Sequence, residues 1–170
     1  LNLDLSDPRA RAPKAVEAMK KEMDHLEKVG VWTLTDVEEA ADVRNREPQA
    51  EFFTTHMLCG IKFSELPEEM WKYKARGVAG GHNVKNAFGE KVEPTENMYV
   101  LPVGLAGIRI LVVYDHSMKG KVYAADIDGA YLHADLTGNP RHTRFDKSMM
   151  PESWKKFRDP VTRVWKSIYG

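Results

Sequence analysis

Two aspartates on either side of one apolar residue offer oxygen ligands for a metal ion. Asp126 and Asp128 flank Ile127 and precede Gly129. Mg²⁺ prefers oxygen ligands and retains waters, so the Asp126 carboxylate and the Ile127 backbone carbonyl would form half of a magnesium site. Two such ions assist phosphoryl transfer by stabilising the attacking and the leaving oxygens. Asp128 is either a further ligand on the same strand face or a solvated turn residue, and turns and caps are where a lone aspartate ordinarily lies.

Basic residues gather over residues 71–91, in a chain whose 25 Lys and Arg balance 25 Asp and Glu. Strand side chains alternate between faces, so Lys72, Lys74 and Arg76 should share one face. Such a face suits phosphate groups, whose attraction is independent of base sequence and sensitive to salt. Arg76 is the strongest candidate, because a guanidinium can bind phosphate bidentately. The alternative is a solvated strand face without a ligand.

Other arrangements of reactive side chains do not form a recognisable site. His56 and Cys59 have metal-like spacing, but no second pair follows at a zinc-site interval. The sequence has no glycine-rich loop ending in Lys-Ser or Lys-Thr, and no nucleophile elbow. These absences exclude P-loop and hydrolase interpretations.

Length and composition favour one domain, or part of one, inside a cell. The 170 residues, 42% of them hydrophobic, suffice for one core and would crowd two. The single cysteine cannot form an internal disulfide, which suits a reducing setting, cytoplasmic or nuclear. The longest apolar stretch, 103–114, contains Arg109 and is shorter than the ~20 residues of a membrane helix, so no membrane partner is expected. The start at Leu1, without a leader pattern, suggests an excision point.

Two helices are predicted among the elements that position these residues. Helical spacing of apolar residues indicates an amphipathic helix over 14–29, ended by Gly30. A second helix should start at Pro102 and end near Gly120. The acidic segment 36–51 has little periodicity and is interpreted as a solvated loop.

The predicted strands give an α+β fold class. Strand-like composition over 54–63 and 71–79 predicts a long hairpin. A short strand over 122–128 would end at Gly129 and present the Asp126 carboxylate to a cleft. The last strand is expected over 161–169.

Four longer blocks follow one another along the chain. They are residues 15–34 (AVEAMKKEMDHLEKVGVWTL), 73–81 (YKARGVAGG), 108–111 with 126–132 (IRIL and DIDGAYL), and 164–170 (VWKSIYG). In this order they resemble copia-type retrotransposon reverse transcriptases: an opening helix, a basic fingers strand, the entry to the palm with polymerase motif A, and a string beyond it. An ordered four-block match is harder to obtain by chance than one motif.

The resemblance implies an architecture and a reaction. The chain would be the fingers (about 14–100) and the start of the palm (about 101–170) of a reverse-transcriptase-like polymerase fold, incomplete at its C-terminal end. The implied activity is RNA-directed DNA polymerisation within a retrotransposon polyprotein. The implied partners are an RNA or DNA template with its primer, deoxynucleoside triphosphates, and the remaining palm and thumb, RNase H and integrase parts.

The resemblance also assigns roles to residues. Asp126 would be the catalytic metal ligand, with Ile127 and Asp128 beside it, in a two-Mg²⁺ site of which this chain supplies half. Tyr131 would lie beneath the incoming sugar, where its ring would exclude a 2′-hydroxyl. The alternative for Tyr131 is an ordinary half-buried core tyrosine.

Departures from the family pattern favour a second hypothesis. Gly77 and Gly80 stand where the family has a large apolar and a basic residue, and they are expected to loosen the fingers. The family's second catalytic motif, a hairpin with paired aspartates, would lie beyond residue 170, so the isolated fragment is expected to be inactive. The alternative function is a degenerate or domesticated remnant that binds nucleic acid or protein without catalysis.

Overall fold

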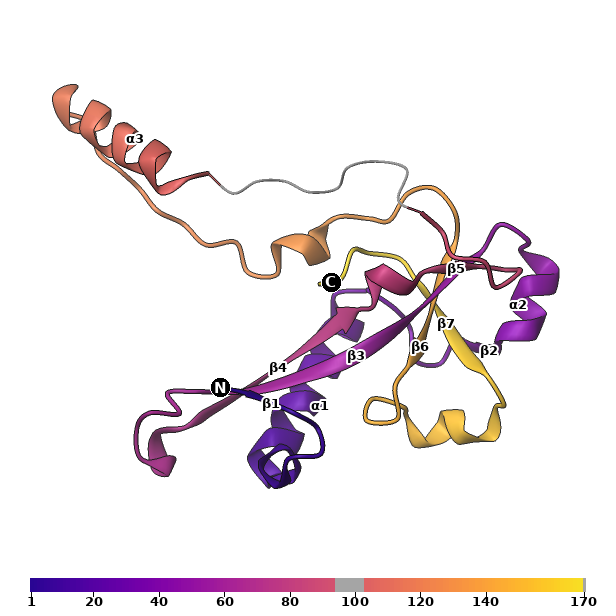
Figure 1. Cartoon of the computed structure of the whole chain (residues 1–170). Coiled ribbons are helices and arrows are strands. Elements are labelled where there is room, and N and C mark those ends of the chain that lie inside the picture. Colours follow the sequence, from indigo (N-terminus) through magenta and orange to yellow (C-terminus); the bar gives the residue numbers. More distant parts are fainter. Residues whose placement is uncertain (94–102, 170) are drawn as a thin grey trace. The chain divides into compact units, whose positions relative to one another are not determined.

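The computed structural model describes residues 1–93 and 103–169 and contains mixed α and β structure (Figure 1). It divides into two compact units. The first consists of Leu1–Val92 and Gly129–Gly170, and the second of Glu93–Asp128. The expected α+β class is thus confirmed.

A mixed sheet forms the centre of the first unit. Among the described residues it has seven strands, in the order β1-β3-β6-β7-β2, with β4 and β5 also paired to β3. The strands are β1 (Asn2–Leu3), β2 (Val37–Glu39), β3 (Glu51–Lys62), β4 (Lys72–Ala79), β5 (Lys85–Asn86), β6 (Arg141–Phe145) and β7 (Pro160–Val164). β3 pairs in parallel with β6 and antiparallel with β1, β4 and β5. β7 lies between β6 and β2 and pairs antiparallel with each of them.

The predicted hairpin is present as β3 and β4, which run side by side in Figure 1. Thr55 is opposite Ala79 at one end of the ladder, and Lys62 is opposite Lys72 at the other. The connection contains a short 3-10 helix, Glu68–Met70. The β-strand composition and Pro67 therefore predicted this element correctly.

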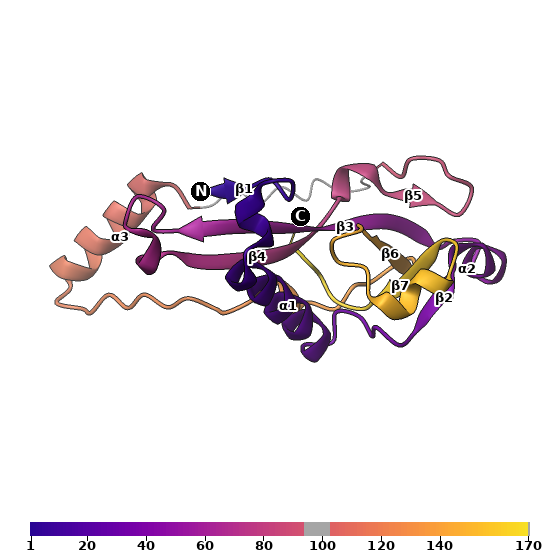
Figure 2. The ribbon, with the colours of Figure 1, turned by 90° about the horizontal axis from the view of Figure 1, so that it is seen from below.

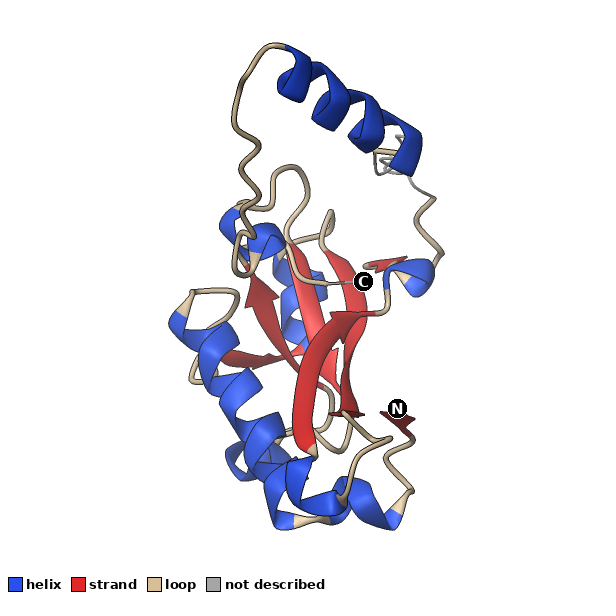
Figure 3. Cartoon of the chain, turned by 90° about the vertical axis from the view of Figure 1, so that its left-hand side faces the viewer, coloured by secondary structure: helices blue, strands red, loops and turns tan. Residues whose placement is uncertain are grey.

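Helix α1 (Pro13–Lys28) covers one face of the hairpin, as Figures 2 and 3 show. Proline occupies its first turn, where the missing N–H costs nothing, and Gly30 follows with a φ of 80°. Leu26 is fully buried between the helix and the sheet. The helix predicted over 14–29 is therefore confirmed within one residue at each end.

Gly77 lies where α1 packs against β4. A Cβ built on Gly77 would come within 2.7 Å of Leu26 Cδ1. The Gly77 N–H also donates to Glu22 on α1, at 3.2 Å. Gly77 therefore permits close packing of helix on strand, which differs from the loosening that the sequence suggested.

Replacing Gly77 by alanine should destabilise the first unit. Leu26 must shift within a packed core to admit the new methyl group, so we expect the free energy of unfolding to fall by about 1–3 kcal/mol. Urea denaturation measures this change. Gly81→Ala is the matched control, because nothing lies within 4 Å of a Cβ at that position. Equal stability of the two variants would contradict the packing role of Gly77.

Three aromatic rings form the centre of the main core. Trp154 stacks on Phe145 with ring centroids 4.7 Å apart, and Trp32 contacts the same Phe145 edge-on at 4.9 Å. The Trp154 indole N–H donates to the carbonyl of Leu34 at 2.9 Å. These rings join the segment after α1, the end of β6 and a 3-10 helix, Glu152–Lys156.

The acidic segment 36–51 is not the solvated loop that was predicted. It contains β2, helix α2 (Ala40–Arg46) and the first residue of β3. Ala40 and Val43 are fully buried, and the Glu39 carboxylate accepts from the N–H groups of Arg158 and Asp159. The acidic composition indicated only the solvent-facing side of this segment. It did not exclude a helix, because two small apolar residues three positions apart suffice to bury one face of a short helix.

The second unit contains helix α3 (Leu105–Ser117), which confirms the helix expected after Pro102; Pro102 itself lies outside the described residues. The strand predicted over 122–128 is wrong, because residues 121–127 have no regular structure and are exposed. Alternation of apolar and polar residues would give a strand one apolar and one polar face. A strand also needs a neighbouring strand to which its backbone can hydrogen-bond.

The final strand is shorter than predicted. β7 ends at Val164, although isolated bridges continue at Lys166 and Tyr169. Tyr169 lies beside Val78 of β4, and its carbonyl accepts from the N–H of Ala79. Across the described residues, none of the helices has the length and apolar character needed to span a membrane.

Candidate functional site

The exposed face of the β3–β4 hairpin carries the basic residues predicted from the sequence. Lys72, Lys74 and Arg76 are exposed, whereas Ala75 and Gly77 between and beyond them are buried. The three cations therefore share one face, as period-2 alternation requires. This part of the prediction is confirmed.

The strand register adds a fourth cation that the sequence analysis missed. Lys62 is exposed and directly opposite Lys72, and Leu58 is opposite Arg76 on the same face. Like charges opposite one another in a ladder are destabilising, and a bound anion would relieve that repulsion. We call Lys62, Lys72, Lys74 and Arg76 the basic face. Only the pairing of β3 with β4 could have revealed Lys62 as a member.

A cavity of about 390 Å³ opens at this face. Its lining includes Lys62, Lys74 and Arg76, together with Leu58 and the first residues of the chain. Lys72 lies to one side, with its ammonium 5.9 Å from the centre of the Phe63 ring. The cations that line the cavity suit it to an anionic group.

Tyr169 brings two of the predicted site residues together. The Arg76 guanidinium lies over the Tyr169 ring, 5.2 Å from its centroid. Tyr131, in the 3-10 helix Ala130–His133, meets the same ring edge-on at 5.9 Å. Tyr131 is 66% exposed, which excludes the half-buried core tyrosine. A cation over one aromatic ring with a second ring at its edge forms a corner for a ligand that is partly anionic and partly apolar.

The predicted metal ligands lie in the second unit. Asp126, Ile127 and Asp128 are exposed, and Asp126 is in neither a helix nor the strand expected for it. Their donors are hard oxygens, which fit the chemistry of Mg²⁺. Across the residues that the structure describes, no group of three or more His, Cys, Asp or Glu side chains is arranged to hold a metal ion. A magnesium site at these residues stays a prediction.

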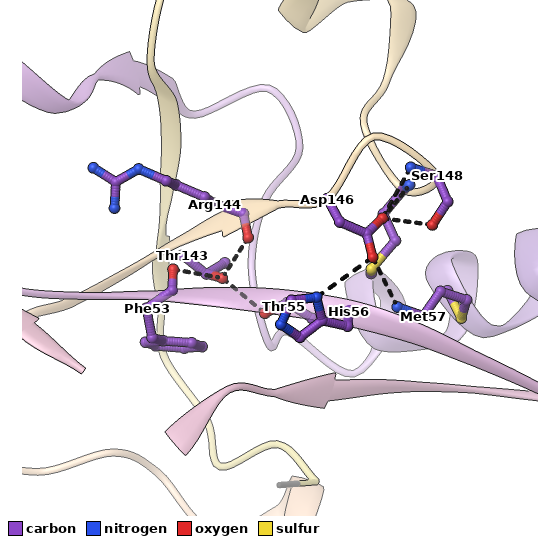
Figure 4. A network of polar contacts seen from close by, with 9 residues as sticks. Phe53, Thr55, His56, Met57, Thr143, Arg144, Asp146 and Ser148 are labelled. Carbon is purple, nitrogen blue, oxygen red and sulfur yellow. Dashed lines mark hydrogen bonds and ion pairs between the residues drawn. The ribbon is translucent and has the colours of Figure 1, made fainter. Parts of the chain in front are cut away.

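His56 and Cys59 point to opposite faces of β3, so they cannot share a metal ion. His56 is exposed and its Nδ1 lies 3.6 Å from Asp146, whereas Cys59 is buried and burial raises the pKa of its thiol. Asp146 also accepts from the backbone N–H groups of Met57, Ser148 and Met149 (Figure 4). Asp146 therefore ties the loop after β6 to β3, and its bonds explain its position without a catalytic role.

The hairpin is joined to β6 by a second set of contacts in Figure 4. The Thr55 and Thr143 hydroxyls are 2.7 Å apart in the buried sheet interior. Thr143 also donates to the carbonyl of Phe53 on β3 at 3.5 Å. These bonds hold β3, and with it the basic face, against the rest of the sheet.

Comparison with known proteins adds no relative to these observations: no protein-family model, no curated protein and no solved structure matches the chain. The fold itself defines a mixed α+β protein with a basic hairpin face.

Proposed function

We propose that this chain is the fingers and the start of the palm of an RNA-directed DNA polymerase, as its resemblance to copia-type reverse transcriptases implies. The observation that carries the proposal is the contact of Arg76 and Tyr131 with one ring, that of Tyr169. All three residues fall in blocks that resemble the family, and the blocks are distant in sequence. Their shared contact with Tyr169 gathers a cation and an exposed aromatic ring at one place, and this supports the proposal.

The corner suits a deoxynucleoside triphosphate in two ways. The Arg76 guanidinium can bind phosphate oxygens bidentately, and Lys74 lies on the same strand face. The exposed Tyr131 ring can pack under the sugar, where it would collide with a 2′-hydroxyl. The rest of the basic face would hold the phosphates of the template and primer, without reading bases.

The proposed cofactor is Mg²⁺, held in part by the Asp126 carboxylate and the Ile127 carbonyl, with Asp128 as a further ligand. When bound, a pair of such ions would stabilise the attacking and leaving oxygens of nucleotidyl transfer. The chain's own residues bind and orient: Arg76 holds the triphosphate and Tyr131 selects the sugar. The resemblance implies that the family's paired-aspartate motif supplies the remaining ligands.

Primer extension tests this proposal. A product extended through the paired-aspartate motif should extend a primer on an RNA template with Mg²⁺, and Asp126→Asn should abolish the activity because it removes an anionic metal ligand. The 170-residue chain alone should show no extension. Activity of the longer product that survives Asp126→Asn would sink the assignment of Asp126.

The choice of sugar gives a second readout in the same assay. Tyr131→Val in the longer product should raise incorporation of ribonucleotides relative to deoxyribonucleotides. Tyr123→Val is the matched control, since Tyr123 is 85% exposed in the other unit. An unchanged sugar preference in Tyr131→Val would remove the selective role of Tyr131.

One observation favours the alternative, a remnant that binds nucleic acid without catalysis. Asp126 lies in a segment without regular structure, whereas the basic face is built on two paired strands. Binding residues are thus more firmly positioned than the metal ligands. A longer product that binds primer and template but never extends the primer would establish this alternative.

A further inference from the structure

A second cavity in the first unit is unrelated to the basic face. Its volume is about 360 Å³, and it lies between β2, the end of α2, β6 and β7. Its lining includes Glu38, Arg46, Glu47, His142 and Trp165. The proposed polymerase function uses none of these residues.

Two polar atoms at this cavity are buried without a partner. Glu47 Oε2 and His142 Nδ1 have no hydrogen-bond partner among the described residues. Buried polar atoms are nearly always paired, because an unpaired one loses its hydration without compensation. Two such atoms beside one cavity mark a place where a hydrogen-bonding ligand group would be favoured.

The neighbouring cation cannot satisfy Glu47 Oε2. Arg46 donates to both carboxylate oxygens of Glu38, at 2.6 and 2.9 Å, and to Oε1 of Glu47, at 3.1 and 3.3 Å. Arg46 is therefore shared between two carboxylates, which leaves this trio with a net negative charge. Arg163 and Asp36 also line the cavity, so its three carboxylates and two guanidinium groups still leave a net charge of −1. The Arg163 guanidinium lies over the Trp165 ring, 4.2 Å from its centroid.

His142 supplies a second acceptor. Its ring is 1% exposed and is stacked on Phe52, with centroids 5.7 Å apart. Burial lowers the pKa of His142, which favours the neutral imidazole. One nitrogen of a neutral imidazole is an acceptor, so the cavity combines an anionic acceptor with a neutral one.

We propose that this cavity binds the primary ammonium group of a small alkylamine, with Glu47 Oε2 and His142 as its acceptors. An ammonium has three donors and no acceptor, which matches the two unpaired atoms and the excess negative charge. Both residues line the cavity, and the two unpaired atoms themselves are buried. The terminal torsion of a glutamate is broad, so a small rotation of the Glu47 carboxylate can bring Oε2 to the ligand.

The probe is butylammonium, and the signal is the imidazole resonance of His142 in a nitrogen-15-labelled chain. We expect a saturable shift with butylammonium and none with tetramethylammonium, which has the same charge but no N–H donor. The melting temperature should rise with butylammonium only, since a ligand that binds the folded state stabilises it. This comparison needs no variant and is unaffected by a folding defect.

Glu47→Gln tests the anionic acceptor. It should weaken butylammonium binding by about tenfold or more, the usual contribution of a hydrogen bond to a charged group. Glu152→Gln, the same change at an exposed position paired with Lys155, should leave the affinity unchanged.

Three results would overturn the proposal: an equal shift with tetramethylammonium, wild-type affinity in Glu47→Gln, or a His142 response to Zn²⁺ or Mg²⁺ without one to butylammonium. Failure of the polymerase assay would not bear on it, since the two sites share no residue.

Discussion

A chain in which Lys72, Lys74 and Arg76 are changed to glutamine should bind a primer–template duplex with little dependence on salt. Each phosphate neutralised by a cation contributes about −0.9 to the slope of log affinity against log salt, so three contacts give about −2.7. Between about 50 and about 200 mM salt the unmodified chain should therefore lose about 40-fold more affinity than the variant, which retains only Lys62 of the basic face. The variant should bind weakly at both concentrations, as titration with a labelled duplex will show.

A matched variant tests whether the lost affinity comes from these particular cations or from the loss of any three positive charges. Lys20, Lys28 and Arg158 are exposed and lie outside the hairpin, so changing them to glutamine removes the same charge elsewhere. This variant should retain most of the affinity and of the salt slope. If both triple variants lose the slope equally, the attraction is diffuse and the basic face has no special role.

Trp154→Ala should cause the largest loss of stability. Trp154 is fully buried, stacks on Phe145 and donates to the Leu34 carbonyl. Its removal leaves a cavity and an unpaired carbonyl, so we expect the free energy of unfolding to fall by about 3–5 kcal/mol. Urea denaturation followed by far-UV circular dichroism gives this value.

Trp165→Ala is the control for that loss. Trp165 is 49% exposed and has solvent as a neighbour, so its replacement should cost under about 1 kcal/mol. A loss at Trp165 as large as that at Trp154 would mean that the aromatic stack is not the centre of the core.

The sequence alone determined the elements whose signals are local. Apolar residues at helical spacing specified α1, and β-strand composition around a proline-containing connection specified the β3–β4 hairpin. Alternation along β4 was enough to place Lys72, Lys74 and Arg76 on one face. These features follow from helix and strand periods of 3.6 and 2 residues, which any short window of sequence contains.

Tertiary structure decided every feature that depends on a distant partner. The strand predicted over 122–128 does not form, since alternation cannot supply a neighbouring strand. Helix α2 forms in an acidic segment because β7 and its neighbours bury Ala40 and Val43. Long-range pairing is invisible in local composition, so the sequence could neither predict nor exclude it.

The candidate site likewise depends on contacts between residues that are distant in the sequence. Lys62 joins the basic face only through the register of β3 with β4. Arg76 and Tyr131 are 55 positions apart in the sequence. Both contact the Tyr169 ring, because Tyr169 lies beside β4. The unpaired atoms of Glu47 and His142 become neighbours of one cavity through the packing of α2 against β6 and β7. Residue types suggested which chemistry was possible, and the sheet topology decided which residues could act together.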